Sequence, residues 1–273
     1  MEASDPPCDA GPPPIEVHGL VTSFGDRIIH DHLDLTVKRG EILGLVGGSG
    51  AGKSVLLSTL IGLKKPDEGA VRILGTDIYK DPPHAVQALK SRWGVLFQSN
   101  ALFSNLNVRE NVAAPLFEHT DLPASVIDEL AMIKMGLSGL PAEASELLPA
   151  ELSGGMQKRA GVARALATDP ELLLMDEPTA GLDPIMAAQI DQLVADLANT
   201  LRVTVLLITH DLDTLYAICD RVAVLADNKL AAIGPVAELR SSDHPWIRSY
   251  FAGPRGEAAA RAAERRAATA IAS

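Results

Sequence analysis

The stretch Gly47-Gly48-Ser49-Gly50-Ala51-Gly52-Lys53-Ser54 decides the fold of this chain. It matches the pattern G-x-x-x-x-G-K-[ST] of the phosphate-binding P-loop. Residues 41–46 before it are typical of a buried strand, and residues 54–61 after it are typical of a helix. A strand that runs through glycines into a helix N-terminus points backbone N–H groups at an anion. We therefore predict that this loop binds nucleotide phosphates, with Lys53 on the β- and γ-phosphates and the Ser54 hydroxyl on Mg²⁺.

The composition is that of a globular protein with a sizeable core. The chain has 273 residues, of which 47% are hydrophobic and 22% are charged, which suits one large domain or two closely packed lobes. Its formal net charge of −11 argues against a broad nucleic-acid-binding surface, because such a surface needs clustered Lys and Arg. A local basic site for a nucleotide remains compatible with this balance.

The chain also shows the features of a cytoplasmic protein. Its longest apolar runs, such as residues 203–209, have the length of a strand and fall short of the ~20 residues that a membrane-spanning helix needs. Residues 1–14 have neither a basic start nor an apolar core, so they do not form a secretory signal. The two cysteines, Cys8 and Cys219, give no disulfide framework, so the simplest expectation is that the protein resides in a reducing compartment.

The order of the apolar segments predicts an α/β fold with a parallel sheet. Continuous apolar strands separated by helices are typical of a sheet that is covered on both faces. The strands expected in this way are residues 41–46, 93–97, 172–175 and 203–209, and the long helix is 184–201. Further expected strands are 15–21, 27–29, 33–37 and 71–74, with a terminal hairpin of 221–225 and 230–233.

Three segments fall outside this α/β pattern. Residues 101–150 show helical periodicity interrupted by prolines, which indicates a helical insertion that ends with a helix over 155–168. Residues 1–14, rich in proline and acids, are expected to be a disordered lead-in. The alanine-rich tail from Pro254 is either a helix on a partner surface or a frayed extension.

A second sign of nucleotide chemistry lies at the end of the apolar strand 172–175. Asp176 and Glu177 follow it directly. A carboxylate at this strand end can hold the hydration shell of Mg²⁺, and the next one can polarise the water that attacks a γ-phosphate. Two acids at a strand end can also be merely solvated, but this order has the form of a Walker B strand with a catalytic base. We therefore expect Asp176 to be the Mg²⁺ residue and Glu177 the base.

The third sign is the segment Glu151-Leu-Ser-Gly-Gly-Met-Gln-Lys-Arg159. A serine and two glycines at the start of a helix form a second anion site, although Ser153 could also serve as a plain N-cap. This segment resembles the L-S-G-G-Q signature of ABC transporters. From Ile15 to about Gly234 the chain resembles ABC ATPase subunits, with every element in order.

The resemblance implies a role for each matching residue. Phe24 corresponds to the aromatic residue that stacks on adenine, Gln98 to the Q-loop glutamine and His210 to the switch histidine that contacts the γ-phosphate. Asp183 belongs to the D-loop, residues 180–183. Mg²⁺ would be held by Ser54, Gln98 and Asp176, and ATP by Phe24 and residues 47–55, Val55 included. Two subunits would face each other head to tail, so that Ser153, Gly154, Gly155 and Met156 reach the partner's ATP.

The family resemblance also implies the architecture. The fold would be an α/β P-loop NTPase of ABC type, with a mixed-sheet core, an antiparallel β subdomain and an inserted α-helical subdomain. Residues 15–98 and 167–240 would form the ATPase core and residues 99–166 the helical subdomain with the signature. Residues 1–14 would be the lead-in and residues 241–273 a C-terminal extension.

Departures from the family pattern indicate a subfamily. Met156 stands where the signature usually has glutamine, Val55 where Thr or Ser is frequent, and Gly48 where proline is common. With residues 47–57, 96–112 and 115–123, these positions closely resemble the ATPases of Mla/MCE-type phospholipid transport systems. Ala101, Leu102, Phe103 and Leu106 would either form part of the socket for a permease helix or belong to the core of the helical subdomain.

This second resemblance implies partners and a location. The partners would be a permease dimer, an MCE-domain protein and, in some systems, a STAS-domain subunit, with the ATPase on the cytoplasmic face of the inner membrane. An importer ATPase for amino acids or another small solute is the alternative. A soluble ABC ATPase that acts on nucleic acid is disfavoured by the acidic charge and the single cassette, and a non-enzymatic subunit by the intact Lys53, Asp176, Glu177 and His210.

Overall fold

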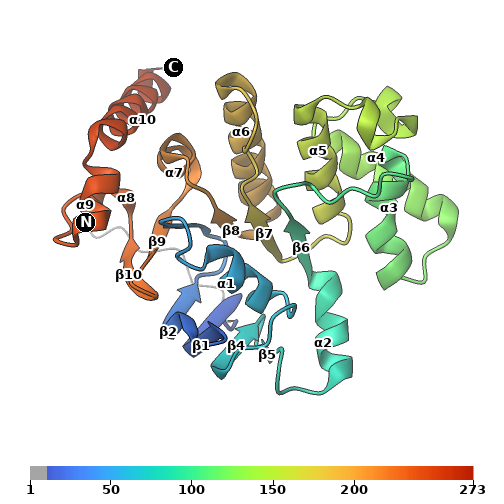
Figure 1. Ribbon diagram of the computed structural model, residues 1–273. Helices are drawn as coiled ribbons and strands as arrows, with labels where there is room; N and C mark the ends of the chain where they lie inside the picture. Colours follow the sequence, from blue (N-terminus) through green and yellow to red (C-terminus); the bar gives the residue numbers. More distant parts are fainter. Residues whose placement is uncertain (1–10, 273) are drawn as a thin grey trace, which may run out of the picture.

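The computed structural model describes residues 11–272 in two sheets and several groups of helices (Figure 1). Residues 1–10 of the predicted lead-in over 1–14 lie outside the described residues, and Cys8 is among them. The strands are β1 (Ile15–Phe24), β2 (Arg27–Val37), β3 (Ile42–Gly47), β4 (Glu68–Ile73), β5 (Thr76–Asp77), β6 (Trp93–Leu96), β7 (Leu172–Asp176), β8 (Thr204–Ile208), β9 (Arg221–Ala226) and β10 (Lys229–Gly234). The helices are α1 (Lys53–Leu60), α2 (Pro83–Leu89), α3 (Val108–His119), α4 (Ala124–Leu137), α5 (Gly154–Ala165), α6 (Pro184–Leu201), α7 (Leu212–Ile218), α8 (Val236–Leu239), α9 (Pro245–Phe251) and α10 (Pro254–Ala272), with 3-10 turns η1 (Lys90–Arg92), η2 (Ala142–Glu146) and η3 (Pro149–Glu151).

The larger sheet has six strands in the order β10-β9-β3-β8-β7-β6. All neighbours are parallel except β10 and β9, which form the predicted antiparallel hairpin. Strands β3 and β8 are buried along almost their whole length, as expected for a sheet covered on both faces. Because the strands are parallel, the carboxyl ends of β3, β7 and β8 meet at one edge, and the predicted P-loop, Asp176 and His210 all follow these ends.

The smaller sheet is antiparallel, with the order β2-β1-β4-β5, and lies below α1 in Figure 1. The prediction of two separate strands over 27–29 and 33–37 was wrong, because β2 runs unbroken from Arg27 to Val37. The strand absorbs an irregularity in its pairing with β1, and His32 has a φ of 53° there. The alternation of apolar residues is interrupted at this point, so the sequence pattern alone divides the strand.

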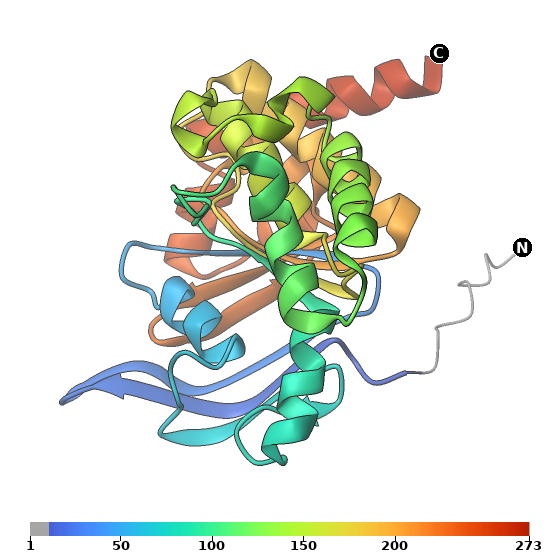
Figure 2. The same ribbon diagram turned by 90° about the vertical axis from the view of Figure 1, so that its right-hand side faces the viewer.

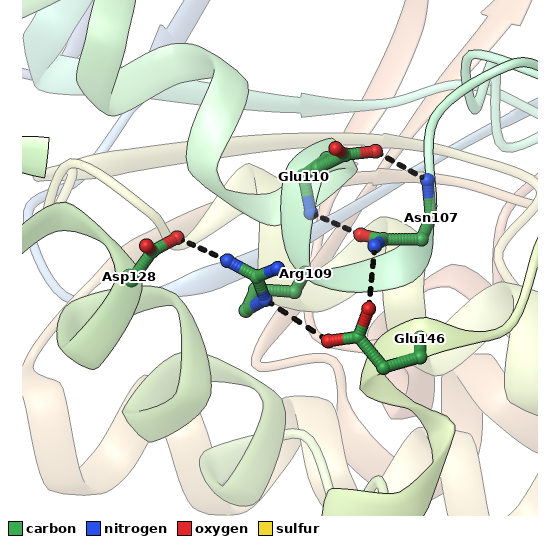
Figure 3. Close-up of polar contacts among 5 residues, drawn as sticks. All are labelled: Asn107, Arg109, Glu110, Asp128 and Glu146. Atoms are coloured by element: carbon green, nitrogen blue, oxygen red, sulfur yellow. Dashed lines mark hydrogen bonds and ion pairs between the residues drawn. The ribbon is translucent and has the colours of Figure 1, made fainter. Parts of the chain in front are cut away.

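Helices α3, α4 and α5 pack around a hydrophobic cluster of their own, which includes Val112, Ala131 and Ala160. The first helix of this group begins only at Val108, so residues 101–107, expected to belong to the helical region, form turns and loop. Asn107 starts α3 with a capping box, in which its side chain accepts from Glu110 N–H and the Glu110 carboxylate accepts from Asn107 N–H. Figure 3 shows that Arg109, on the same turn, reaches Asp128 on α4 and Glu146 in η2, which ties three segments together.

The tail from Pro254 forms the helix α10, and its first half packs against the chain's own α7 and α9, with Ala259 and Ala260 buried. The frayed-extension alternative is therefore wrong for this part, and the surface that α10 covers belongs to the same chain. In Figure 2 the last part of α10 projects beyond the rest of the molecule. Among residues 11–272, none of the helices has the length and apolar character needed to cross a membrane.

Candidate functional site

The P-loop connects β3 to α1 in the predicted way, and its glycines are required by geometry. Gly50 and Gly52 have φ values of 78° and 95°, which residues other than glycine rarely adopt. A Cβ at Gly52 would also lie 2.5 Å from Nε2 of His30, on the neighbouring strand β2. The loop therefore rests directly on the antiparallel sheet, and its N–H groups lead into the N-terminus of α1 at Lys53.

Lys53 turns back onto the loop. Its Nζ donates to the carbonyl oxygens of Gly47 at 2.7 Å and Gly48 at 3.2 Å. Burial lowers the pKa of Lys53, and the nearby carboxylates of Glu177 and Asp176 act in the opposite direction. The ammonium group is thus close to both acids, and a phosphate could take over the bonds that the loop carbonyls now accept.

The two acids at the end of β7 have different surroundings. Burial raises the pKa of Asp176, and the charge of Glu177 raises it further, against the opposing effects of Lys53 and Lys158. Glu177 adopts a φ of 50°, a strained conformation for a non-glycine residue, while its N–H donates to Ile208 O at 2.8 Å. This turn directs the Glu177 carboxylate towards His210, whose Nδ1 lies 2.8 Å from Oε1 of Glu177.

His210 follows β8, and its side chain is 75% exposed, whereas that of Glu177 is 13% exposed. Both line a cavity of about 1220 Å³ that also includes residues 179–182, which overlap the predicted D-loop at 180–183, and residues of α9 and α10. A separate cavity of about 250 Å³ lies over residues 50–55 of the P-loop. The predicted base and switch histidine are therefore in direct contact at one edge of the sheet.

Gln98 follows β6, and its backbone is held by a residue that sequence reasoning did not single out. Nζ of Lys158, on α5, donates to Gln98 O at 2.8 Å and to Glu177 O at 3.3 Å. Lys158 is only 3% exposed, and burial lowers its pKa while Glu177 and Asp176 counteract that effect. Its position five residues after Ser153, within the signature helix, was the available signal.

The signature residues lie at the start of α5. Ser153 is the N-cap, since its Oγ accepts from Met156 N–H at 3.3 Å. Positions 154 and 155 face Leu182 and Met186, and Asp183 caps α6 by accepting from Ile185 N–H and Met186 N–H. Within the described residues 11–272, no side chain of residues 153–156 lines either of the two cavities named above. One chain thus does not bring the signature to its own P-loop cavity.

The predicted adenine-stacking residue lies at the tip of the β1–β2 hairpin. Phe24 is 58% exposed, and Lys64 Nζ lies 4.4 Å from the centre of its ring. A second residue of this hairpin, Arg27, was missed. It lines the P-loop cavity, and its guanidinium lies 3.7 Å from where a Cβ of Gly50 would be. A cation at this point suits a phosphate or a ribose oxygen.

The segment after Gln98 is held by Arg164 of α5, which donates to Asn100 O at 2.8 Å and Ala101 O at 2.6 Å. For the four residues at positions 101, 102, 103 and 106, socket and core were both open, and the structure settles only the packing of Leu102. Leu102 packs against the helical cluster, whereas Phe103 is 52% exposed with Arg164 beside its ring. The exposed ring of Phe103 is thus available to a partner.

The donor set suits Mg²⁺. This ion prefers oxygen ligands and is usually bound by one or two carboxylates together with substrate phosphates. Asp176 offers a carboxylate, Ser54 a hydroxyl and Gln98 an amide oxygen, and across residues 11–272 there is no group of three or more His, Cys, Asp or Glu side chains that could hold a metal by itself. Phosphate oxygens of a nucleotide would complete the coordination that these side chains offer.

Known proteins resemble this chain over most of its length. A family model described as ABC transporter matches residues 30–180. The chain is 42% identical over 241 residues to a probable ribonucleotide transport ATP-binding protein, mkl, of Mycobacterium tuberculosis, covering 88% of this chain and 67% of the relative. It is 40% identical over 239 residues to the intermembrane phospholipid transport system ATP-binding protein MlaF of Escherichia coli, covering 88% of each.

Solved structures agree with the fold. A dimeric ATP-binding cassette in a post-hydrolysis state with ADP and phosphate matches with a TM-score of 0.73 at 28% identity, over 81% of this chain and 98% of that one. The cbiO1 protein of Clostridium perfringens, part of the ABC transporter complex cbiONQ, matches with a TM-score of 0.76 at 27% identity, over 89% and 96%. The predicted α/β P-loop fold with an antiparallel subdomain is thereby confirmed.

Proposed function

From the premise that this chain belongs to the family of ABC transporter ATP-binding subunits, we propose that it powers phospholipid transport through a membrane permease. As a member of this family it binds ATP and hydrolyses it in a reaction coupled to transport. The proposal concerns the substrate, the partners and the residues that carry the reaction.

The observation that supports a phospholipid substrate is the similarity to MlaF, at 40% identity with 88% of each chain covered. This match extends over the segment after Gln98, where the exposed Phe103 is available to a partner. We propose a permease and an MCE-domain protein as partners, and a STAS-domain subunit as a further one. A position on the cytoplasmic face of the inner membrane follows from this assembly, and nucleic acid is not among the partners.

The proposed reaction assigns a task to each part of the site. Residues 47–55, which include Lys53, hold the phosphates, and Phe24 holds the adenine. Ser54, Gln98 and Asp176 would hold Mg²⁺, which would neutralise charge at the phosphates. Glu177 polarises the attacking water, and His210 orients the Glu177 carboxylate through the 2.8 Å contact and reaches the γ-phosphate.

We further propose that the working unit is a head-to-tail homodimer. Residues 153–156 line neither cavity of their own chain, and their N–H groups at the start of α5 form an anion site that a second copy could use. Dimeric cassettes among the similar structures support this arrangement. In the same assembly, residues 15–98 and 167–240 are the ATPase core and residues 99–166 the helical subdomain.

The substrate is tested with the complex purified from its native membrane. We expect an MCE-domain protein and bound phospholipid to copurify with the tagged chain, and ATP to drive lipid transfer between vesicles and the complex. Copurification of a solute-binding protein without lipid would contradict the proposal. It would favour small-solute transport, for which the similarity to mkl, named for ribonucleotide transport, is the supporting observation.

The residue roles are tested separately by ATP hydrolysis. Glu177→Gln should still bind ATP and form the dimer but lose turnover about 100-fold or more, because it removes the general base. Lys53→Ala should abolish nucleotide binding, whereas Lys38→Ala, which changes an exposed lysine in the connection before β3, should bind nucleotide normally. Parent-level turnover in Glu177→Gln would refute its assignment as the base.

A further inference from the structure

The short helix α9 lies against two different loops of the ATP site. The Oη of Tyr250 donates to the backbone oxygen of His210 at 2.8 Å. A Cβ at Gly48 in the P-loop would lie 3.5 Å from Nε1 of Trp246, one turn earlier on α9. Both aromatic residues line the cavity that contains Glu177 and His210. The C-terminal extension, to which the sequence assigned no task, therefore forms a wall of the reaction site.

The aromatic residues of α9 are held rigidly from the other side. Tyr250 stacks on Trp246 with ring centres 4.9 Å apart and an angle of 12°, and it meets Phe251 edge to face at 5.0 Å. Phe251 and Ile247 are fully buried in a cluster with Val46. Helix α10 packs against α9 as well, so the hydroxyl of Tyr250 is presented from a fixed support.

The hydroxyl of Tyr250 remains a hydrogen-bond donor over the whole working range of pH. Burial raises the pKa of Tyr250, and the nearby charges of Asp211 and Glu177 raise it further. The ring of His210, in contrast, is largely exposed, and its contact with Glu177 is the polar side-chain bond that the structure gives it. The position of this ring therefore depends on its backbone, and Tyr250 holds that backbone at its carbonyl oxygen.

We propose that Tyr250 is a positioning residue for ATP hydrolysis. It acts through His210, since it fixes the switch loop at the point where the imidazole meets the Glu177 carboxylate. It is not among the residues proposed to hold nucleotide or metal, so we expect its effect on turnover. The inference rests on the roles proposed for Glu177 and His210 and is independent of the transported substrate.

The test compares two identical substitutions in the purified transporter complex. Tyr250→Phe removes the hydroxyl and keeps the stacked ring. Tyr216→Phe, on α7, is the matched control, because the buried hydroxyl of Tyr216 has no hydrogen-bond partner among the described residues. For each variant we measure kcat and KM for ATP hydrolysis and the thermal midpoint of unfolding.

The expected result is a separation of kcat from KM. Loss of one neutral hydrogen bond lowers kcat about fivefold in Tyr250→Phe, with KM within about twofold of the parent. Tyr216→Phe should hydrolyse ATP at the parent rate. Parent-level kcat in Tyr250→Phe, or an equal loss in both variants, would overturn the inference.

A third variant separates this failure from a failure of the proposed site. If Glu177→Gln loses turnover while Tyr250→Phe does not, only the role of Tyr250 is wrong. If Glu177→Gln retains turnover, the base itself is misassigned, and Tyr250 has no Glu177–His210 contact to position.

Discussion

A substitution of Lys158 tests most directly how the ATP site is connected to the helical subdomain. Its buried ammonium donates to the backbone oxygens of Gln98 and Glu177 and so connects α5 to both segments. The substitution Lys158→Met keeps most of the volume and removes both bonds. Hydrogen bonds from a charged donor contribute roughly 1.5–3 kcal/mol each, but the desolvation of a buried ammonium offsets part of this. We expect a net loss of about 2 kcal/mol in the free energy of unfolding.

The catalytic effect should be separable from this loss of stability. Without Lys158 the backbone at Gln98 and Glu177 is less constrained, and kcat should fall about tenfold, which corresponds to about 1.4 kcal/mol in the activation barrier. Lys158 also opposes the raised pKa of Asp176. Its removal should therefore raise that pKa further in the nucleotide-free enzyme and move the acid limb of the kcat/KM–pH profile to higher pH.

A second buried lysine provides the matched control. Lys134 on α4 is 4% exposed and forms an ion pair with Asp169, remote from both cavities. Lys134→Met should lower stability by a comparable amount and leave kcat and the pH profile of kcat/KM unchanged. The assays are ATP hydrolysis by the purified complex from pH 5 to 9 and calorimetric unfolding. If both variants show the same kcat, or if the acid limb does not move in Lys158→Met, the coupling attributed to Lys158 does not exist.

Three further predictions concern neighbouring parts of the fold. Burial lowers the pKa of His30 from 6.5 to about 4, so the unfolded chain binds this proton at higher pH than the folded chain does. The free energy of unfolding should therefore fall by up to about 3 kcal/mol as pH drops from 6.5 to 4. In denaturant titrations, the free energy of unfolding of His30→Phe should depend less on pH than that of the parent. Gly94→Ala would bring a Cβ to 1.9 Å from the backbone oxygen of Ala165 and should lower the free energy of unfolding by about 3 kcal/mol. An unchanged midpoint in urea unfolding would refute this prediction. Arg27→Ala should raise KM for ATP several-fold with kcat unchanged, because it removes a cation beside Gly50, and a parent-level KM would exclude that contact.

Local chemistry made the centre of the site predictable from the sequence. A glycine loop between a buried strand and a helix, and two acids at a strand end, carry their own geometry over a few residues. The parallel order of β3, β8 and β7 then brings these segments to one edge without any further information. The contact between Glu177 and His210 is a consequence of that topology, because β7 and β8 are neighbours.

The misses have a common physical cause, which is contact between segments that are distant in the chain. Lys158 lies 3% exposed inside a helix, and nothing in its immediate neighbours indicates that Gln98 and Glu177 will surround it. Tyr250 meets His210 only because the extension returns to the sheet edge. Similarly, β2 continues through His32 because its partner β1 supplies the pairing, which the interrupted pattern of β2 alone does not reveal.

The two lysines near Asp176 and Glu177 differ in solvent exposure, and this difference decides what each ammonium group can bind. Lys53 and Lys158 both lie near Asp176 and Glu177, and both donate to backbone carbonyls. Lys53 is partly exposed in the P-loop, so its ammonium can exchange the carbonyls of Gly47 and Gly48 for phosphate oxygens. Lys158 is 3% exposed, so we expect its bonds to Gln98 and Glu177 to persist when nucleotide binds. Because Lys158 belongs to the helix that Ser153 caps, we expect an anion bound at the start of α5 to be sensed at Gln98 and Glu177 of the same chain through this fixed connection.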